Sequence, residues 1–202
     1  TSIPVEDLFR AGYREYEAGR YEQAAAAFTR AAKEASDHSA AVEYLGRSFL
    51  AMGRHDAAIG QFQDLARRPG QEIAGRRLEA RALAASGDTL GARAAVERAV
   101  AANQADGETY ALGGELSLQL GDAAGAVTCL ETALARGSGT PAVRAMLGEA
   151  FVRLGAVDKG LAQLDAAVKA DPGEIATWRR AGRVFQSLGR PRDALERYRR
   201  AL

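Results

Sequence analysis

The chain of 202 residues contains a single cysteine, which excludes an intrachain disulfide framework and a cysteine-rich zinc site. Neither sign of charge dominates: 27 basic and 26 acidic side chains leave a formal net charge of +1. The overall charge therefore gives no electrostatic case for nucleic acid or an anionic membrane as the main partner. No apolar run approaches the ~20 residues that a transmembrane helix needs. The sequence is informative about architecture rather than chemistry, and the architecture favours a binding function over catalysis.

Asparagine is nearly absent, with Asn103 alone, and Val, Ile and Thr are sparse, while alanine fills 45 positions. Because alanine has the highest helix propensity, this composition predicts an all-helical chain. Lysine occurs only at three positions, and the excess of Ala, Arg and Gly indicates a bacterial genome of high GC content. The sequence starts without an initiator Met or a signal-peptide hydrophobic region, so Thr1 is either a boundary within a longer chain or a mature terminus.

Glycine recurs at intervals of 34 residues, and each of these glycines lies between two stretches with helical periodicity. A tight turn between two helices needs a residue that tolerates positive φ, so each glycine is expected to form such a turn. The six turn glycines are Gly19, Gly53, Gly87, Gly121, Gly155 and Gly189.

Two further sets of equivalent positions, here called columns, recur with the same period of 34 residues. A small residue lies seven positions before each turn glycine: Gly12, Gly46, Ala80, Gly114, Gly148 and Gly182. A bulkier residue lies nine positions after it: Phe28, Phe62, Val96, Leu130, Leu164 and Tyr198. Small residues let two helices approach closely and large ones fill the space beside them. Each repeat is thus predicted to be two antiparallel helices.

The period and the columns resemble the tetratricopeptide repeat (TPR), whose pattern is W-x₂-L-G-x₂-Y, then A-x₃-F, then P. The sixth copy reads Trp178-x₂-Ala181-Gly182-x₂-Phe185, then Ala194-x₃-Tyr198, and in the third copy Glu79 replaces the Leu. The resemblance implies an all-α fold, a right-handed superhelix of six helix-turn-helix repeats in one domain, 1–202. The approximate repeats are 5–38, 39–72, 73–106, 107–140, 141–174 and 175–202.

The helix starts follow from this register. The first helices are predicted to begin near Val5, Ser39, Glu72, Gly107, Pro141 and Glu174. The second helices are predicted to begin near Tyr21, His55, Thr89, Ala123, Val157 and Pro191. Pro141 and Pro191 suit a first helical turn, where no amide hydrogen is needed.

In this family the first helices line a concave groove that binds partner segments. The resemblance places on that groove Phe9, Tyr13, Tyr16, Arg47, Arg77, Arg81, Glu115, Glu149, Arg179 and Arg183, and also Leu118. The alternative is that the charged members only keep an exposed helix face soluble. Arg47, Arg77 and Arg81 are expected to form one basic patch for an acidic segment. The family's chaperone-tail clamp, which needs a Lys and two Asn on first helices, is absent.

Nothing in the sequence indicates a catalytic residue, a metal ligand set or a cofactor. His38 and His55 are seventeen residues apart without a further ligand at helical spacing. Cys129 has no histidine near it, so it is expected to be a partly buried small residue. The glycine-rich loop at 136–140 lacks the Walker lysine, and Trp178 is expected to pack between helices.

The favoured function is a non-enzymatic scaffold that binds a protein or peptide segment, within a bacterial assembly such as a pilus, secretion or envelope machine. The alternative is a regulatory or substrate-recruiting domain of a larger enzyme or transporter. A third hypothesis is self-assembly, in which the groove binds a terminus of another copy. The apolar face of the last helix, with Leu195, Tyr198 and Leu202, is expected to be covered by a partner, another copy or further sequence. No nucleic acid partner and no membrane insertion are expected, and the compartment stays open.

Overall fold

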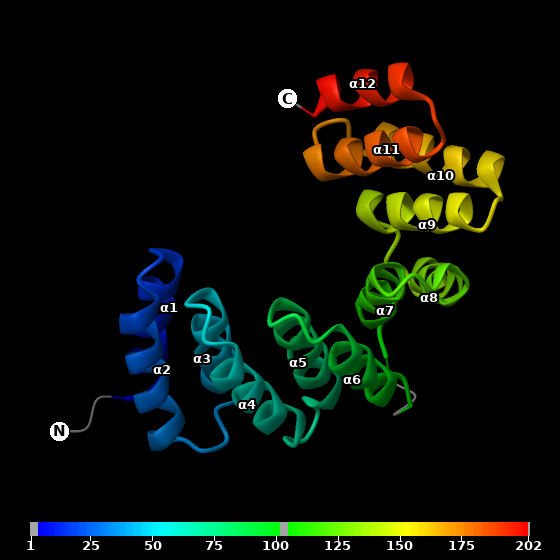
Figure 1. The fold of residues 1–202 in the computed structure, drawn as a ribbon. Helices are drawn as coiled ribbons and strands as arrows, with labels where there is room; N and C mark the ends of the chain where they lie inside the picture. Colours follow the sequence, from blue (N-terminus) through cyan, green and yellow to red (C-terminus); the bar gives the residue numbers. More distant parts are fainter. Residues whose placement is uncertain (1–3, 102–104, 202) are drawn as a thin grey trace. The chain divides into compact units, whose positions relative to one another are not determined.

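The computed structural model describes residues 4–101 and 105–201, and within these ranges it holds twelve α-helices and no strand (Figure 1). Thr1, Asn103 and Leu202 lie outside the described residues. The helices fall into two compact units, Thr1–Gln104 and Ala105–Leu202, called unit 1 and unit 2. The single domain over 1–202 stays a prediction.

Unit 1 consists of three helix pairs joined by short turns. Each helix packs on the next one along the chain, and the first helices α1 and α3 also contact each other. The helices are α1 (Val5–Glu17), α2 (Tyr21–Glu34), α3 (Ser39–Ala51), α4 (His55–Ala66), α5 (Glu72–Ala85) and α6 (Thr89–Ala101).

Unit 2 repeats this arrangement with three more pairs. Consecutive helices pack on each other, and α9 contacts both α7 and α11, so the first helices of this unit are neighbours. The helices are α7 (Gly107–Gln119), α8 (Ala123–Ala135), α9 (Pro141–Arg153), α10 (Val157–Ala170), α11 (Ile175–Ser187) and α12 (Pro191–Arg200).

The predicted helix starts are confirmed almost everywhere. Only α11 differs: it begins at Ile175, because Glu174 has the extended backbone of a residue that precedes a helix. Pro141 and Pro191 both stand in the first turn of their helices, as their missing amide hydrogens require. All six turn glycines have φ between +68° and +92°, a range that is strained for residues with a Cβ.

Within a repeat, the residue of the small column contacts the residue of the bulky column where the two helices cross. A Cβ on Gly46 would lie 2.5 Å from a ring carbon of Phe62, and one on Gly114 would lie 2.4 Å from Cγ of Leu130. Phe62 and Leu130 have no exposed surface, so neither can move away cheaply. Glycine in the small column therefore sets how closely the two helices of a repeat approach.

Trp178 is buried as expected, beside Val168 and Ala201, and its indole N–H donates to the carbonyl of Pro172 at 2.8 Å. Cys129 is half-buried, also as expected. Leu118 does not lie on an open groove: it is 4% exposed and belongs to the core between α7, α8 and α9. The groove register is therefore wrong at this position, because α8 and α9 pack over this side chain.

Side-chain caps satisfy the first amides of several helices. At the start of α8, the carboxylate of Asp122 accepts a hydrogen bond of 2.8 Å from the amide of Gly125. We expect Asp122→Ala to lower the free energy of unfolding by about 1 kcal/mol, because that amide loses its partner, whereas Asp122→Ser should retain most of it. Urea denaturation followed by circular dichroism measures the difference. Equal stability of the alanine and serine variants would contradict the capping role.

Candidate partner-binding surface

An aromatic cluster joins α1 and α3 in unit 1. Tyr44 is its centre: its ring centroid lies 5.2 Å from that of Tyr13, 5.4 Å from that of Tyr16 and 5.8 Å from that of Phe9. Phe9 also packs on Phe28, at 5.5 Å between centroids. The three predicted aromatic residues are thus brought together. Phe9 and Tyr16 are half-buried, however, and pack against the core of unit 1.

Tyr13 and Tyr16 of this cluster stay neutral at physiological pH. The nearby carboxylate of Glu17 raises the pKa of Tyr13 above its ordinary value of 10.0, and Tyr44 contributes in the same direction. Burial is the main cause that raises the pKa of Tyr16. Both residues therefore present a phenol that can donate a hydrogen bond next to an apolar ring.

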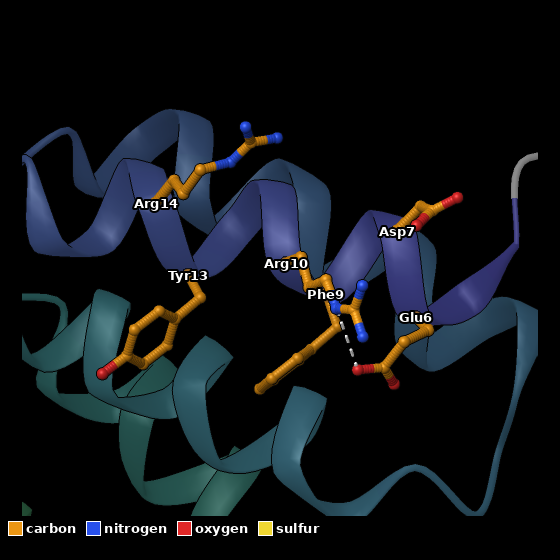
Figure 2. A pocket seen from close by; sticks show the side chains of 6 residues that line it. All are labelled: Glu6, Asp7, Phe9, Arg10, Tyr13 and Arg14. Atoms are coloured by element: carbon orange, nitrogen blue, oxygen red, sulfur yellow. Dashed lines mark ion pairs between the residues drawn. The ribbon is translucent and has the colours of Figure 1, made fainter.

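A hollow of about 600 Å³ opens beside α1 (Figure 2). Figure 2 shows the rings of Phe9 and Tyr13 on one side of the helix, with Asp7 and Arg14 on the other. Tyr13 is 38% exposed. The hollow thus combines ring surface with charged groups, and its lining residues are Glu6, Asp7, Phe9, Arg10, Tyr13 and Arg14.

The basic residues predicted on unit 1 differ in their surroundings. Arg47 pairs with Glu43 at 2.7 Å, and its guanidinium lies 5.7 Å from the centre of the Tyr44 ring. Arg77 is half-buried and makes an interaction of its own, while Arg81 is exposed. Because Glu43 offsets the charge of Arg47, the basic patch of three arginines has less free positive charge than the sequence implies, and it stays a prediction.

In unit 2 the predicted acidic residues lie on α7 and α9. Glu115 is half-buried on α7. Glu149 on α9 accepts hydrogen bonds from Arg153 on its own helix and from Arg180 on α11, and only 14% of its side chain is exposed. Glu149 is therefore neutralised within the chain, which makes it a link between first helices rather than an open acidic contact.

A second hollow, of about 440 Å³, lies between α9 and α11. The predicted residues Arg179 and Arg183 line it and are both exposed. Two further lining residues were not predicted: Ile175, which is 49% exposed, and Arg180. The available signal for Arg180 was its place next to the predicted groove residue Arg179. The full lining is Ala142, Ile175, Ala176, Thr177, Arg179, Arg180 and Arg183.

A smaller hollow of about 210 Å³ lies between α11 and α12, lined by Arg179, Leu195, Tyr198, Arg199 and Ala201. Leu195 on α12 is 51% exposed. Tyr198 is half-buried against Gly182, and its hydroxyl lies 3.1 Å from Oε1 of Gln186. Of the three residues expected on this face, Leu202 lies outside the described residues.

The described residues include no group of three His, Cys, Asp or Glu side chains that could hold a metal ion. His38 instead caps α3, where its Nδ1 accepts from the amide of Ala41 at 3.1 Å, and its ring packs on Phe9. No helix in the described part of the chain is long and apolar enough to cross a membrane.

Stacked helix pairs with side chains gathered around hollows beside first helices define a helical-repeat binding protein. A family model for the tetratricopeptide repeat matches residues 9–72 and 111–175, close to two thirds of the chain. The chain therefore belongs to the tetratricopeptide repeat family, and the all-α class of helix-turn-helix repeats is confirmed. Proteins of this family generally act as non-catalytic scaffolds that bind protein or peptide partners.

Solved structures agree with this assignment. A thermophilic TPR protein of Thermus thermophilus is 25% identical with a TM-score of 0.69, over 91% of this chain and 100% of that one. A tetratricopeptide repeat protein from Parabacteroides merdae is 15% identical with a TM-score of 0.77, over 96% and 77%. YrrB, described as a TPR protein with an unusual peptide-binding site, is 19% identical with a TM-score of 0.64, over 88% and 91%. No curated protein matches the sequence at a significant level.

Proposed function

We propose that this chain is a non-enzymatic scaffold that holds a segment of a partner protein against its first helices, within a bacterial multi-protein assembly such as a pilus, secretion or envelope machine. The observation that carries the proposal is the position of the hollows. Two of them, beside α1 and between α9 and α11, open next to first helices and are lined by Phe9, Tyr13, Arg179 and Arg183, four of the residues expected to contact a partner.

The chemistry of these residues supports a peptide as the ligand. Tyrosine and arginine contribute large contact areas and directed hydrogen bonds, and they are enriched where binding energy is concentrated. The hollow between α9 and α11 is open to solvent, which suits an extended or helical segment. YrrB shows that the fold is compatible with a peptide-binding site.

A photo-crosslinking experiment in the source bacterium tests the proposal. p-Benzoylphenylalanine replaces Tyr13 in one variant and Arg183 in another, both exposed on first helices. We expect at least one of these variants to crosslink to one partner, and mass spectrometry to map the crosslink to one segment of it. The matched controls carry the crosslinker at Gln23 or Ala166, which are exposed on the second helices α2 and α10. Equal crosslinking from the controls, or none from either test position, would overturn the proposal.

A further inference from the structure

The net charge of +1 conceals a strongly uneven distribution. Residues 175–202 hold eight arginines, no lysine and two carboxylates, a net charge of +6. The preceding 174 residues therefore carry a net charge of −5. A local excess of this size attracts an oppositely charged partner even when the whole chain is nearly neutral.

Part of this positive charge is neutralised within unit 2. Three ion pairs account for it: Arg180 with Glu149, Arg190 with Asp193 and Arg197 with Asp165. Among the described residues, five exposed arginines of the repeat are outside these pairs: Arg179, Arg183, Arg192, Arg199 and Arg200. The excess charge is therefore available at the surface.

Three of these exposed arginines line hollows. Arg183 and Arg179 are one helical turn apart on α11, so their side chains leave the same face. Arg179 lines both hollows of unit 2, and Arg199 on α12 lines the smaller one. The two hollows thus meet at Arg179 and form one strip, which we call the arginine strip.

Aliphatic side chains accompany the arginines along the strip. Ile175 lines the larger hollow and is 49% exposed, and Leu195 lines the smaller one and is 51% exposed. Guanidinium groups bind carboxylates through two parallel hydrogen bonds, while exposed aliphatic groups gain from contact with apolar side chains. A nucleic acid would use the arginines and leave Ile175 and Leu195 in water.

We propose that the arginine strip is the docking site for a partner segment in which acidic side chains alternate with aliphatic ones. This inference rests on the proposed function and names the chemistry of the segment. The acidic side chains pair with Arg179, Arg183 and Arg199, and the aliphatic ones cover Ile175 and Leu195.

Fluorescence anisotropy of the full chain with a short labelled peptide that alternates pairs of glutamate and leucine tests the proposal. Arg179→Glu with Arg183→Glu is expected to weaken binding at least about tenfold, because two carboxylate contacts become repulsive. The matched control, Arg192→Glu with Arg200→Glu, changes the net charge equally at exposed arginines outside both hollows, and it should weaken binding less than about threefold. Equal losses in the two variants, or no binding to the wild-type chain, would overturn the proposal.

Three further probes test the occupant. Serine in place of leucine in the peptide should weaken binding about fivefold or more, because the aliphatic contacts are lost. Single-stranded DNA that binds more tightly than the peptide would overturn the proposal in favour of nucleic acid. Light scattering that shows self-association, abolished by Arg179→Glu with Arg183→Glu, would assign the strip to a second copy and overturn the proposal.

The crosslinking experiment separates this inference from the proposed function. Crosslinks from Tyr13 without any from Arg183 would retain the proposed function and overturn this inference.

Discussion

Gly75→Ala is expected to lower the free energy of unfolding of unit 1 by roughly 3 kcal/mol, although alanine has the higher helix propensity. Gly75 is buried on α5, where the chain passes directly over the end of α4. A Cβ there would lie 2.4 Å from the backbone nitrogen of Ala66 and 2.6 Å from its Cα. Because the obstacle is backbone, no rotamer change relieves it, and the two helices must move apart.

Gly60→Ala is the matched control. Gly60 is exposed on α4, and a Cβ at this position would meet no atom within 4 Å. The same substitution should therefore stabilise the chain by up to about 1 kcal/mol, since alanine favours the helix. Urea denaturation, with hydrogen exchange to assign the change to α4 and α5, measures both variants. A Gly75→Ala protein of unchanged stability, with unchanged hydrogen exchange in these helices, would show that α4 and α5 pack less closely at this crossing than the structure indicates.

The local features of this fold could be predicted from the sequence because they repeat. A turn glycine, a helix start or a pair such as Gly46 and Phe62 depends on residues of a single repeat, so the 34-residue period reveals it six times over. Gly75 has no such signal. The corresponding residues one repeat away on either side are Ala41 and Thr109, and the close approach at Gly75 depends on where α4 ends.

The candidate surface was less predictable, because its electrostatics depend on contacts between repeats. Arg180 reaches Glu149 across 31 residues of sequence, which removes an acidic site from the first helices. Tyr44 unites three predicted aromatic residues through helix stacking, which periodicity alone does not describe. One signal was local: Glu43 and Arg47 have the spacing of a helical ion pair, and this spacing indicates that the charge of Arg47 is offset.

Glu79 is the place where the third repeat departs most from its family, since a carboxylate stands where the pattern has Leu. The residue is 1% exposed, so its charge is removed from water. Its oxygens accept from Gln63 on α4 at 3.0 Å, from Arg76 on α5 at 3.0 Å and from Arg98 on α6 at 3.2 Å. The substitution is tolerated because three helices each supply a donor to the buried carboxylate.

Arg76→Met combined with Arg98→Met is therefore expected to destabilise unit 1 by on the order of 3 kcal/mol, because it leaves a buried charge without a counter-ion. Adding Glu79→Leu to these two changes restores the family's residue, and it should recover most or all of the loss, since a buried ion cluster replaced by apolar side chains is often neutral. Arg93→Met on α6 is the control: Arg93 pairs with Glu97 at the surface, so its loss should change stability by less than about 1 kcal/mol. Urea denaturation of the four proteins, wild type included, completes the comparison. A triple variant no more stable than the double variant would mean that Glu79 contributes more than its charge, for instance by fixing how α5 packs between α4 and α6.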